Sequence, residues 1–273
     1  MSGRVNGALL RRVLERLWRI LVIDLLPRVE DVVVRHRQGR QRYVRRSFLA
    51  EEPVSCEQGL GHALITAALK AYRPSDAVLS EEATEQEKAN SARLTADRVW
   101  IVDPLDGTRE FSELDRDDWA VHVALWQRNG SHGELVAGAV ALPAQGMTLA
   151  TPEVVAPAAH DGPVRVVVSR TRPPAVALAV RDALDGVLVE MGSAGAKVAA
   201  VVQGRADVYV HAGGQYEWDS AAPVAVARSA GLFTARIDGS PLRYNQIDPS
   251  LPDLIVCRPE YAKAVLAVTA PGR

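Results

Sequence analysis

Strands and helices alternate along the second half of the chain. The pattern predicts strands at 164–169, 187–191 and 206–211, and helices at 174–184, 194–203 and about 219–230. Alternation of this kind is typical of a sheet whose faces are covered by helices. We therefore expect an α/β arrangement in this half, with the ends of several strands and helices available for a site.

The first half indicates a mixed α+β arrangement. The pattern predicts helices at 7–26 and 59–71, strands at 76–80, 99–102, 119–126 and 135–142, and a loop or short exposed helix at 83–97. Residues 151–163 are rich in Pro, Ala, Gly and Thr, which favours a boundary there. We predict two units, 1–155 and 163–273, with residues 1–58 atypical because they are rich in Arg.

Composition excludes several classes of protein. The formal net charge of the 273 residues is -1, so a general nucleic-acid-binding role is not expected. No run of about 20 apolar residues occurs, and the apolar stretch Leu17–Leu26 contains Arg19 and Asp24 and lacks a cleavage site, so neither a membrane span nor a signal peptide is predicted. Cys56 and Cys257 lie far apart, which indicates two thiols in a reducing cytoplasm.

An apolar strand runs directly into two aspartates in the segment Trp100–Phe111. Pro104 stiffens the turn and Gly107 permits a sharp bend, so Asp103 and Asp106 are expected on a tight loop that points both into one cleft. Two close carboxylates repel each other and favour cations, and oxygen ligands suit Mg²⁺ together with a phosphate. Free backbone N–H groups after Gly107 would suit that phosphate. The alternative is an ordinary Asp-rich turn.

Two further acidic elements accompany this segment. Glu81 and Glu82 follow a predicted strand, and Asp219 opens a predicted helix in the segment Glu217–Pro223. Each has a simpler explanation, because the pair could be a solvated loop and Asp219 could be a helix N-cap. Three acidic elements at strand or helix ends, beside a turn able to hold phosphate, together favour a metal site.

These elements resemble a known family. The run Asp-Pro-Leu-Asp-Gly-Thr, the upstream Glu-Glu pair and the downstream Trp-Asp-x-Ala-Ala-Pro, from about residue 60 to the end, resemble the inositol monophosphatase-like superfamily. The Ser-Glu-Glu and Asp-Gly-Thr-Arg-Glu-Phe variants look most like its 3′(2′),5′-bisphosphate nucleotidase branch, of the bacterial CysQ type, with the actinobacterial version nearest. The resemblance implies a layered αβαβα sandwich of the sugar-phosphatase type.

The resemblance also implies a site. It assigns two or three Mg²⁺ ions to Glu81, Asp103, Asp106 and Asp219, with help from the carbonyl of Leu105. It places the phosphate on the backbone of Gly107 and Thr108, and gives the Thr108 hydroxyl a role in orienting the attacking water. Leu105, Asp106 and Asp219 also count among the substrate contacts that it implies.

A substrate loop is implied in the second half, at Gly192–Lys197. The family places substrate contacts here, so Ser193 and Lys197 are candidates, and Lys197 could bind a second phosphate or be an ordinary solvated lysine. His122 and Trp218, by contrast, are interpreted as packing residues.

The segment before residue 59 departs from the family pattern. Gln58 stands where the family has an Asp thought to assist water activation, and an amide cannot accept a proton as a carboxylate does. Either Glu57 substitutes, or activity is weakened, or this stretch is not the family's own segment. Residues 1–50 hold twelve Arg and four acids, a net of +8. A basic arm, a diverged helix pair and a shifted reading frame or wrong start in the gene all remain open for them.

The expected function is that of a magnesium-dependent phosphomonoesterase. By resemblance, the substrate is the 3′-phosphate of 3′-phosphoadenosine 5′-phosphate, or of its sulfate ester, in sulfate assimilation. Inositol monophosphate and fructose 1,6-bisphosphate are alternatives, and a metal-binding pseudoenzyme or regulator is an alternative of another class. The expected partner is a small phosphorylated metabolite, with no nucleic acid and no membrane, and the resemblance allows for a homodimer.

Overall fold

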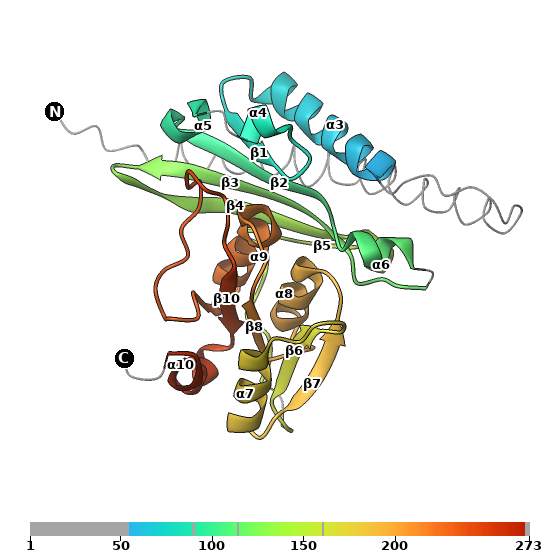
Figure 1. The fold of residues 1–273 in the computed structure, drawn as a ribbon, viewed down its shortest axis with the longest axis vertical. Helices are drawn as coiled ribbons and strands as arrows, with labels where there is room; N and C mark the ends of the chain where they lie inside the picture. The colour runs from blue at the N-terminus through green and yellow to red at the C-terminus, as the bar shows by residue number, and fades with distance from the viewer. Residues whose placement is uncertain (1–54, 89–90, 114, 160, 271–273) are drawn as a thin grey trace, which may run out of the picture.

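The computed structural model of the protein describes residues 55–88, 91–113, 115–159 and 161–270. These residues stack in the order helix, sheet, helices, sheet, helices, as Figure 1 shows from top to bottom. The expected α/β sandwich is confirmed. No helix among the described residues is long and apolar enough to cross a membrane.

The first sheet has its strands in sequence order, β1-β2-β3-β4-β5. They are β1 (Ala77–Ser80), β2 (Arg98–Asp106), β3 (Ala120–Asn129), β4 (His132–Leu142) and β5 (Met147–Ala150). Only β1 and β2 are parallel among them, and the other neighbours run antiparallel. Helix α3 (Ser55–Tyr72) covers the outer face, where Ile65 and Leu69 pack in one apolar cluster with Trp100 and Val102.

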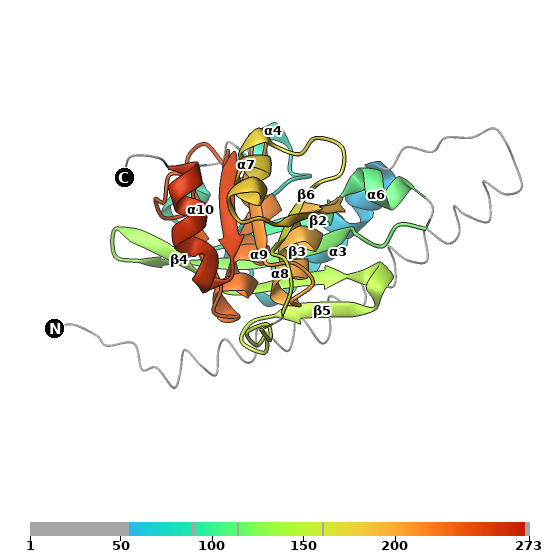
Figure 2. The same cartoon turned by 90° about the horizontal axis from the view of Figure 1, so that it is seen from below.

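The second sheet has the order β7-β6-β8-β10-β9. Its strands are β6 (Arg165–Ser169), β7 (Val187–Met191), β8 (Val208–Ala212), β9 (Phe233–Ala235) and β10 (Asp253–Cys257). Strands β6, β7 and β8 are parallel, whereas β10 runs antiparallel to both of its neighbours. Figure 2, seen from below, shows α7 (Ala175–Ala183) and α10 (Ala262–Thr269) over the outer face.

Helices α8 (Ala194–Val202) and α9 (Glu217–Ser229) form the layer between the sheets. Every residue of α8 is buried, as expected of a helix that is enclosed on all sides. Gly138 of β4 lets α9 approach closely, because a Cβ there would lie 2.6 Å from the Cβ of Ala225. The helix α9 therefore packs closely against the inner face of the first sheet.

Short elements complete the described chain: the helices α4 (Glu85–Lys88), α5 (Ala92–Thr95) and α6 (Thr108–Ser112), and the 3-10 turns η2 (Pro143–Gln145) and η3 (Pro259–Tyr261). All helices and strands predicted from residue 59 onward are present. The elements α6, β5, β9, β10 and α10 were not predicted. The predicted helix at 7–26 and the Arg-rich start lie outside the described residues. The division at 155/163 stays a prediction; residues 151–163 connect the two sheets.

Candidate active site

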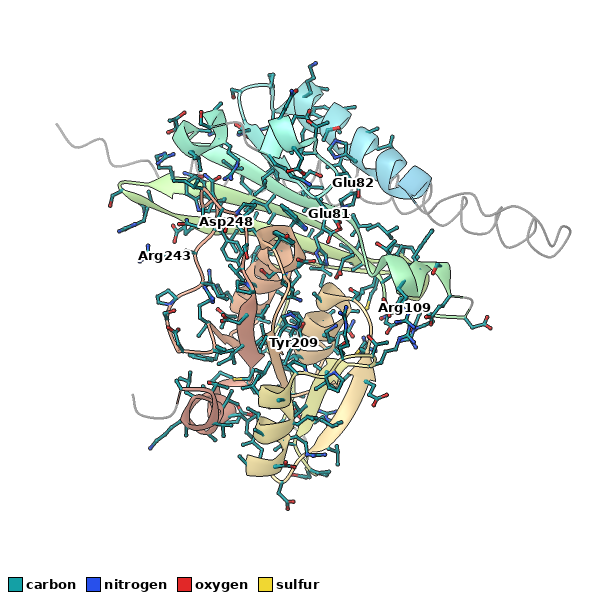
Figure 3. The ribbon with its side chains drawn as sticks, viewed as in Figure 1. Glu81, Glu82, Arg109, Tyr209, Arg243 and Asp248 are labelled. Carbon is teal, nitrogen blue, oxygen red and sulfur yellow. The ribbon has the colours of Figure 1, made fainter. Side chains whose placement is uncertain are left out.

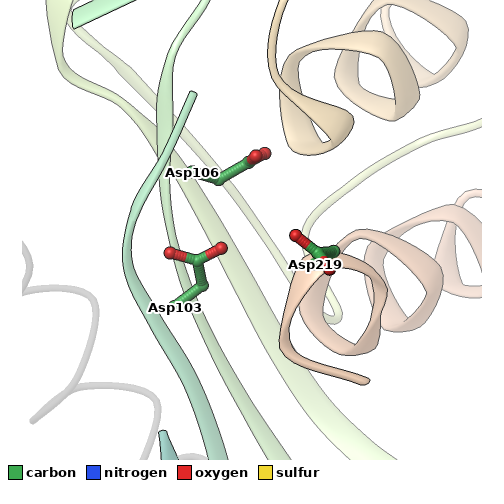
Figure 4. Close-up of side chains that lie close together, drawn as sticks. All are labelled: Asp103, Asp106 and Asp219. Atoms are coloured by element: carbon green, nitrogen blue, oxygen red, sulfur yellow. The ribbon is translucent and has the colours of Figure 1, made fainter. Parts of the chain in front are cut away.

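Three aspartates converge where the first sheet meets the central helices. Asp103 and Asp106 come from β2 and Asp219 from the first turn of α9. One carboxylate oxygen of each lies within 4.8 Å of the others, and Figure 4 shows the three side chains around a common space. Asp103 is 1% exposed and Asp106 is 8% exposed. The fold thus gathers three acids that are far apart in the sequence.

Strand β2 carries both of its aspartates. The expectation of a tight loop is corrected here, because β2 continues to Asp106 with a shift in its pairing to β3 between Asp103 and Asp106. The Leu105 N–H donates to Asp103 Oδ1 at 3.0 Å. An irregularity of this kind bends a strand and redirects its side chains. It explains how residues three apart on one strand reach one site.

The electrostatics of the three aspartates favour cations. Burial, followed by the charges of Glu81, Asp106 and Asp219, raises the pKa of Asp103 well above its usual value. Burial, and then the charge of Asp106, raises the pKa of Asp219 to about 7. Buried carboxylates that repel each other need either protons or a metal ion, and hard oxygen donors suit Mg²⁺. The residues therefore fit a divalent metal centre.

Glu81 lies beside this cluster, just after β1. Its N–H donates to the Val102 carbonyl at 3.2 Å, and its carboxyl shares a hydrogen bond with Asp103. Burial raises its pKa, and so do the nearby charges of Asp106 and Glu82. Figure 3 shows Glu81 and Glu82 together at the end of β1. Of this pair, Glu81 is the member bonded to the aspartate cluster.

The start of α8 is bound to Asp106. Ser193 Oγ lies 2.5 Å from Asp106 Oδ2, the Gly195 N–H donates to the same oxygen at 2.6 Å, and Ala194 N lies 3.3 Å from Oδ1. Ser193 also caps the helix by accepting from the Ala196 N–H at 3.0 Å. A carboxylate at a helix N-terminus is favoured by the unpaired N–H groups and by the helix dipole. The predicted substrate loop is therefore joined directly to a predicted metal ligand.

The turn after Asp106 requires glycine. Gly107 has φ of 87°, and a Cβ there would lie 2.9 Å from Ser193 Cβ and 3.3 Å from Trp119. It precedes α6, whose first residue, Thr108, lies with its hydroxyl 3.4 Å from the Leu105 carbonyl. The turn thus brings Gly107 and Thr108 against the loop that carries Ser193.

Lys197 is buried, so the alternative interpretation of this residue as an ordinary solvated lysine is wrong. The side chain is 5% exposed, its ammonium donates to the Gly192 carbonyl, and Nζ lies 5.5 Å from the centroid of the Tyr209 ring. Burial lowers the pKa of Lys197, while the charges of Asp106 and other acids oppose this. Figure 3 shows Tyr209 beneath the central helices. Burying a cation is costly, and the nearby acids offset part of this cost.

Two residues of the site, His122 and Asp118, were not predicted from the sequence to belong to it. His122 is fully buried as expected, but its Nε2 lies 3.3 Å from Asp106 Oδ2 and its Nδ1 lies 3.1 Å from the Trp218 carbonyl. A Cβ on Gly195 would overlap His122, at 1.9 Å from Nε2. Asp118 accepts from the Gly192 N–H at 2.5 Å. His122 lies opposite Asp103 on the neighbouring strand, a register that only the folded sheet shows.

Most of the sequence matches a known protein family. The sequence model of the Inositol monophosphatase family matches residues 32–270. The chain belongs to the inositol monophosphatase family. The match begins upstream of residue 60, where the resemblance was expected to start, and so includes part of the Arg-rich segment. This is a family of hydrolases that depend on metal ions, which agrees with the acidic cluster.

Individual relatives point to one branch of this family. The 3′-phosphoadenosine 5′-phosphate phosphatase of Mycobacterium tuberculosis (strain CDC 1551 / Oshkosh) is 54% identical over 214 residues, 77% of this chain and 79% of the relative. The 3′(2′),5′-bisphosphate nucleotidase CysQ of Escherichia coli (strain K12) is 30% identical over 203 residues, 70% of this chain and 79% of the relative. The solved structure of CysQ from Bacteroides thetaiotaomicron has a TM-score of 0.70 at 26% identity, with 86% of this chain and 95% of that chain covered. The expected family and branch are confirmed.

Proposed function

We propose that this chain is a magnesium-dependent phosphatase that converts 3′-phosphoadenosine 5′-phosphate and water to AMP and phosphate. Its sulfate ester would give adenylyl sulfate in the same way. The observation that carries the proposal is the convergence of Asp103, Asp106 and Asp219 within 4.8 Å, beside the start of α8. The names of two relatives support the choice of nucleotide. One is a 3′-phosphoadenosine 5′-phosphate phosphatase, and the other is a 3′(2′),5′-bisphosphate nucleotidase.

The metal would be held by the acidic cluster. Asp103, Asp106 and Asp219 supply carboxylate oxygens, and Glu81 is bonded to Asp103. The Leu105 carbonyl would be a further ligand. We expect two or three Mg²⁺ ions. When bound, Mg²⁺ lowers the pKa of a coordinated water and offsets the charge of the phosphate.

Residues of the chain would place the reacting groups. The N–H groups of Gly107 and Thr108 hold the 3′-phosphate, and the Thr108 hydroxyl orients the attacking water. The water oxygen forms a bond to phosphorus, the bond between phosphorus and the 3′-oxygen breaks, and that oxygen takes a proton. Phosphoryl transfer depends mainly on positioning and charge neutralisation, which these groups provide.

The 5′-phosphate would bind at the start of α8. Lys197 is a buried cation whose partner in the structure is the neutral carbonyl of Gly192. Ser193 lies at the N-terminus of the same helix, where its hydroxyl contacts Asp106. A second phosphate at this place would pair with the charge of Lys197 and explain a preference for bisphosphates.

The test is phosphate release from a panel of substrates with and without Mg²⁺. We expect release from 3′-phosphoadenosine 5′-phosphate, dependent on Mg²⁺ and faster than from inositol monophosphate or fructose 1,6-bisphosphate. Preference for either of the latter would change the substrate assignment. No release from any substrate at saturating Mg²⁺ would indicate a pseudoenzyme. A cytoplasmic location and a homodimer stay predictions.

A further inference from the structure

A stacked aromatic pair lies directly beside Asp219. Tyr216 and Trp218 have ring centroids 4.8 Å apart and an interplanar angle of 12°. Trp218 is only 5% exposed, whereas Tyr216 is 45% exposed. Lys88 Nζ lies 5.4 Å from the Trp218 centroid. The pair is therefore anchored through its tryptophan and presents its tyrosine to solvent.

The backbone at Tyr216 is fixed on two sides. Its N–H donates to Asp219 Oδ2 at 2.6 Å, so the residue is bonded to a carboxylate of the acidic cluster. Tyr216 also pairs with Ser250 as an antiparallel bridge, and the Glu217 N–H donates to the Pro249 carbonyl at 2.8 Å. An exposed aromatic ring on such a backbone is held in place before any ligand arrives, which reduces the entropy lost on binding.

The neighbouring loop is held by a buried acid. Glu217 is 1% exposed and accepts from the Asn245 N–H at 2.6 Å and the Gln246 N–H at 2.7 Å. The same loop carries Asp248, labelled in Figure 3, and Ile247, which is 83% exposed. Because a buried carboxylate holds this loop, the fold defines the position of the loop.

We propose that the exposed face of Tyr216, supported from behind by Trp218, is the platform on which the purine base of the substrate stacks. This rests on the proposed function and deepens it. The phosphates are anionic and are drawn to the metal cluster and Lys197, whereas the base is planar and largely apolar. An aromatic ring beside the cluster suits such a group, and inositol and sugar phosphates have no equivalent part.

The experiment separates base recognition from phosphate chemistry. KM and kcat are measured for 3′-phosphoadenosine 5′-phosphate and for ribose 3,5-bisphosphate, which lacks the base, with wild type, Tyr216→Phe, Tyr216→Leu and Tyr216→Ala. For the nucleotide, Tyr216→Leu and Tyr216→Ala should raise KM by roughly 5- to 100-fold, the range that stacking of one base contributes. Tyr216→Phe should stay near wild type, and KM for ribose 3,5-bisphosphate should be unchanged in all. Tyr72→Ala, at an exposed tyrosine at the end of α3, is the matched control.

Equal KM increases for both substrates in Tyr216→Leu, or no increase for the nucleotide, would overturn the stacking proposal. Binding of AMP by calorimetry provides a measurement that does not depend on turnover. A wild-type protein that binds AMP through Tyr216 but releases no phosphate from the nucleotide would refute the proposed function and leave the platform standing. AMP binding that is the same in wild type and Tyr216→Leu would refute the platform.

Discussion

Asp106 combines two tasks at the scale of single residues. Its carboxylate belongs to the acidic cluster, and it also accepts hydrogen bonds from the start of α8. An amide in its place keeps the shape, but it removes a negative charge and replaces one acceptor oxygen by a donor. The metal cluster is expected to be more sensitive to this change than the fold.

Asp106→Asn should therefore lower phosphatase activity by at least about 100-fold, the scale of losing one electrostatic element of catalysis. Steady-state kinetics at saturating Mg²⁺ and circular dichroism measure activity and fold. Asp182→Asn, at an exposed aspartate of α7, is the control and should leave activity unchanged. Turnover of Asp106→Asn equal to wild type would remove this residue from the proposed metal ligands.

Gln58 is the second residue whose chemistry can be tested. The residue lies in α3 one turn before Gly61, where a Cβ would lie 3.3 Å from the Pro104 carbonyl oxygen. The start of α3 is thus close to the segment that carries the aspartates. General-base assistance contributes about 10²- to 10⁴-fold, so Gln58→Asp should raise kcat by tenfold or more.

Glu57→Gln is the companion variant for this prediction. If Gln58→Asp gains nothing and Glu57→Gln abolishes activity, then Glu57 has taken the role of the base. No change in either variant would mean that this end of α3 does not act on the attacking water. Measuring kcat for both variants on the same substrate distinguishes these cases.

At the scale of elements, the start of α8 is joined to the first sheet through a second buried acid, in addition to Asp106. Asp118, just before β3, is 2% exposed and accepts from the Gly192 N–H at 2.5 Å and from Arg116 Nε at 2.7 Å. Beside it, Arg170 pairs with Glu110 of α6 at 3.1 Å. The Asp118 bond connects the segment before β3 with the loop that carries Ser193, and the Arg170 pair connects α6 with the segment after β6.

Asp118→Ala should raise KM by roughly tenfold, because loss of one hydrogen bond to a charged group lets the loop move. Asp118→Asn should recover much of the loss, since its amide oxygen still accepts from the Gly192 N–H. Kinetics with 3′-phosphoadenosine 5′-phosphate gives KM and kcat separately. An unchanged KM in Asp118→Ala, with folding verified by circular dichroism, would show that this bond does not position the loop.

At the scale of the whole molecule, the acidic cluster links stability to pH and metal. The pKa of Asp219 is raised to about 7 by burial and by Asp106, and the pKa values of Asp103 and Glu81 are also raised. An acid whose pKa is higher in the folded than in the unfolded state binds more protons when folded. The free energy of unfolding then increases as the pH falls through the pKa of the folded state towards the pKa of the unfolded state.

The metal-free protein should thus have a higher Tm at pH 6 than at pH 8. The gain in unfolding free energy is up to about 1.4 kcal/mol per pH unit for one proton. Mg²⁺ competes with these protons, so its stabilising effect should be larger at pH 8. Thermal unfolding at pH 6 and pH 8, once with a chelator and once with Mg²⁺, gives the four Tm values needed for this comparison. A Mg²⁺ effect that is equal at both pH values would contradict the linkage.

The sequence alone determined the class of fold and the main acidic residues. Alternating apolar strands and helices are local patterns, and Asp103 directly follows the apolar run Val99–Val102, so both can be predicted from neighbouring residues. The same holds for Asp219 at the start of α9. The strand β9 has only three residues, too few to give a period, and it was not predicted. The strand β10, after a loop with three prolines, was not predicted either.

The tertiary structure decided how these residues meet. Asp118 and Gly192 are 74 positions apart, and His122 and Trp218 are 96 apart, so no local pattern reports their contact. The change from a turn to an irregular strand at Asp106 likewise depends on pairing with β3. The orientation of Tyr216 depends on its bridge to Ser250. Such contacts depend on which surfaces pack together, and this is fixed only when the two sheets enclose α8 and α9.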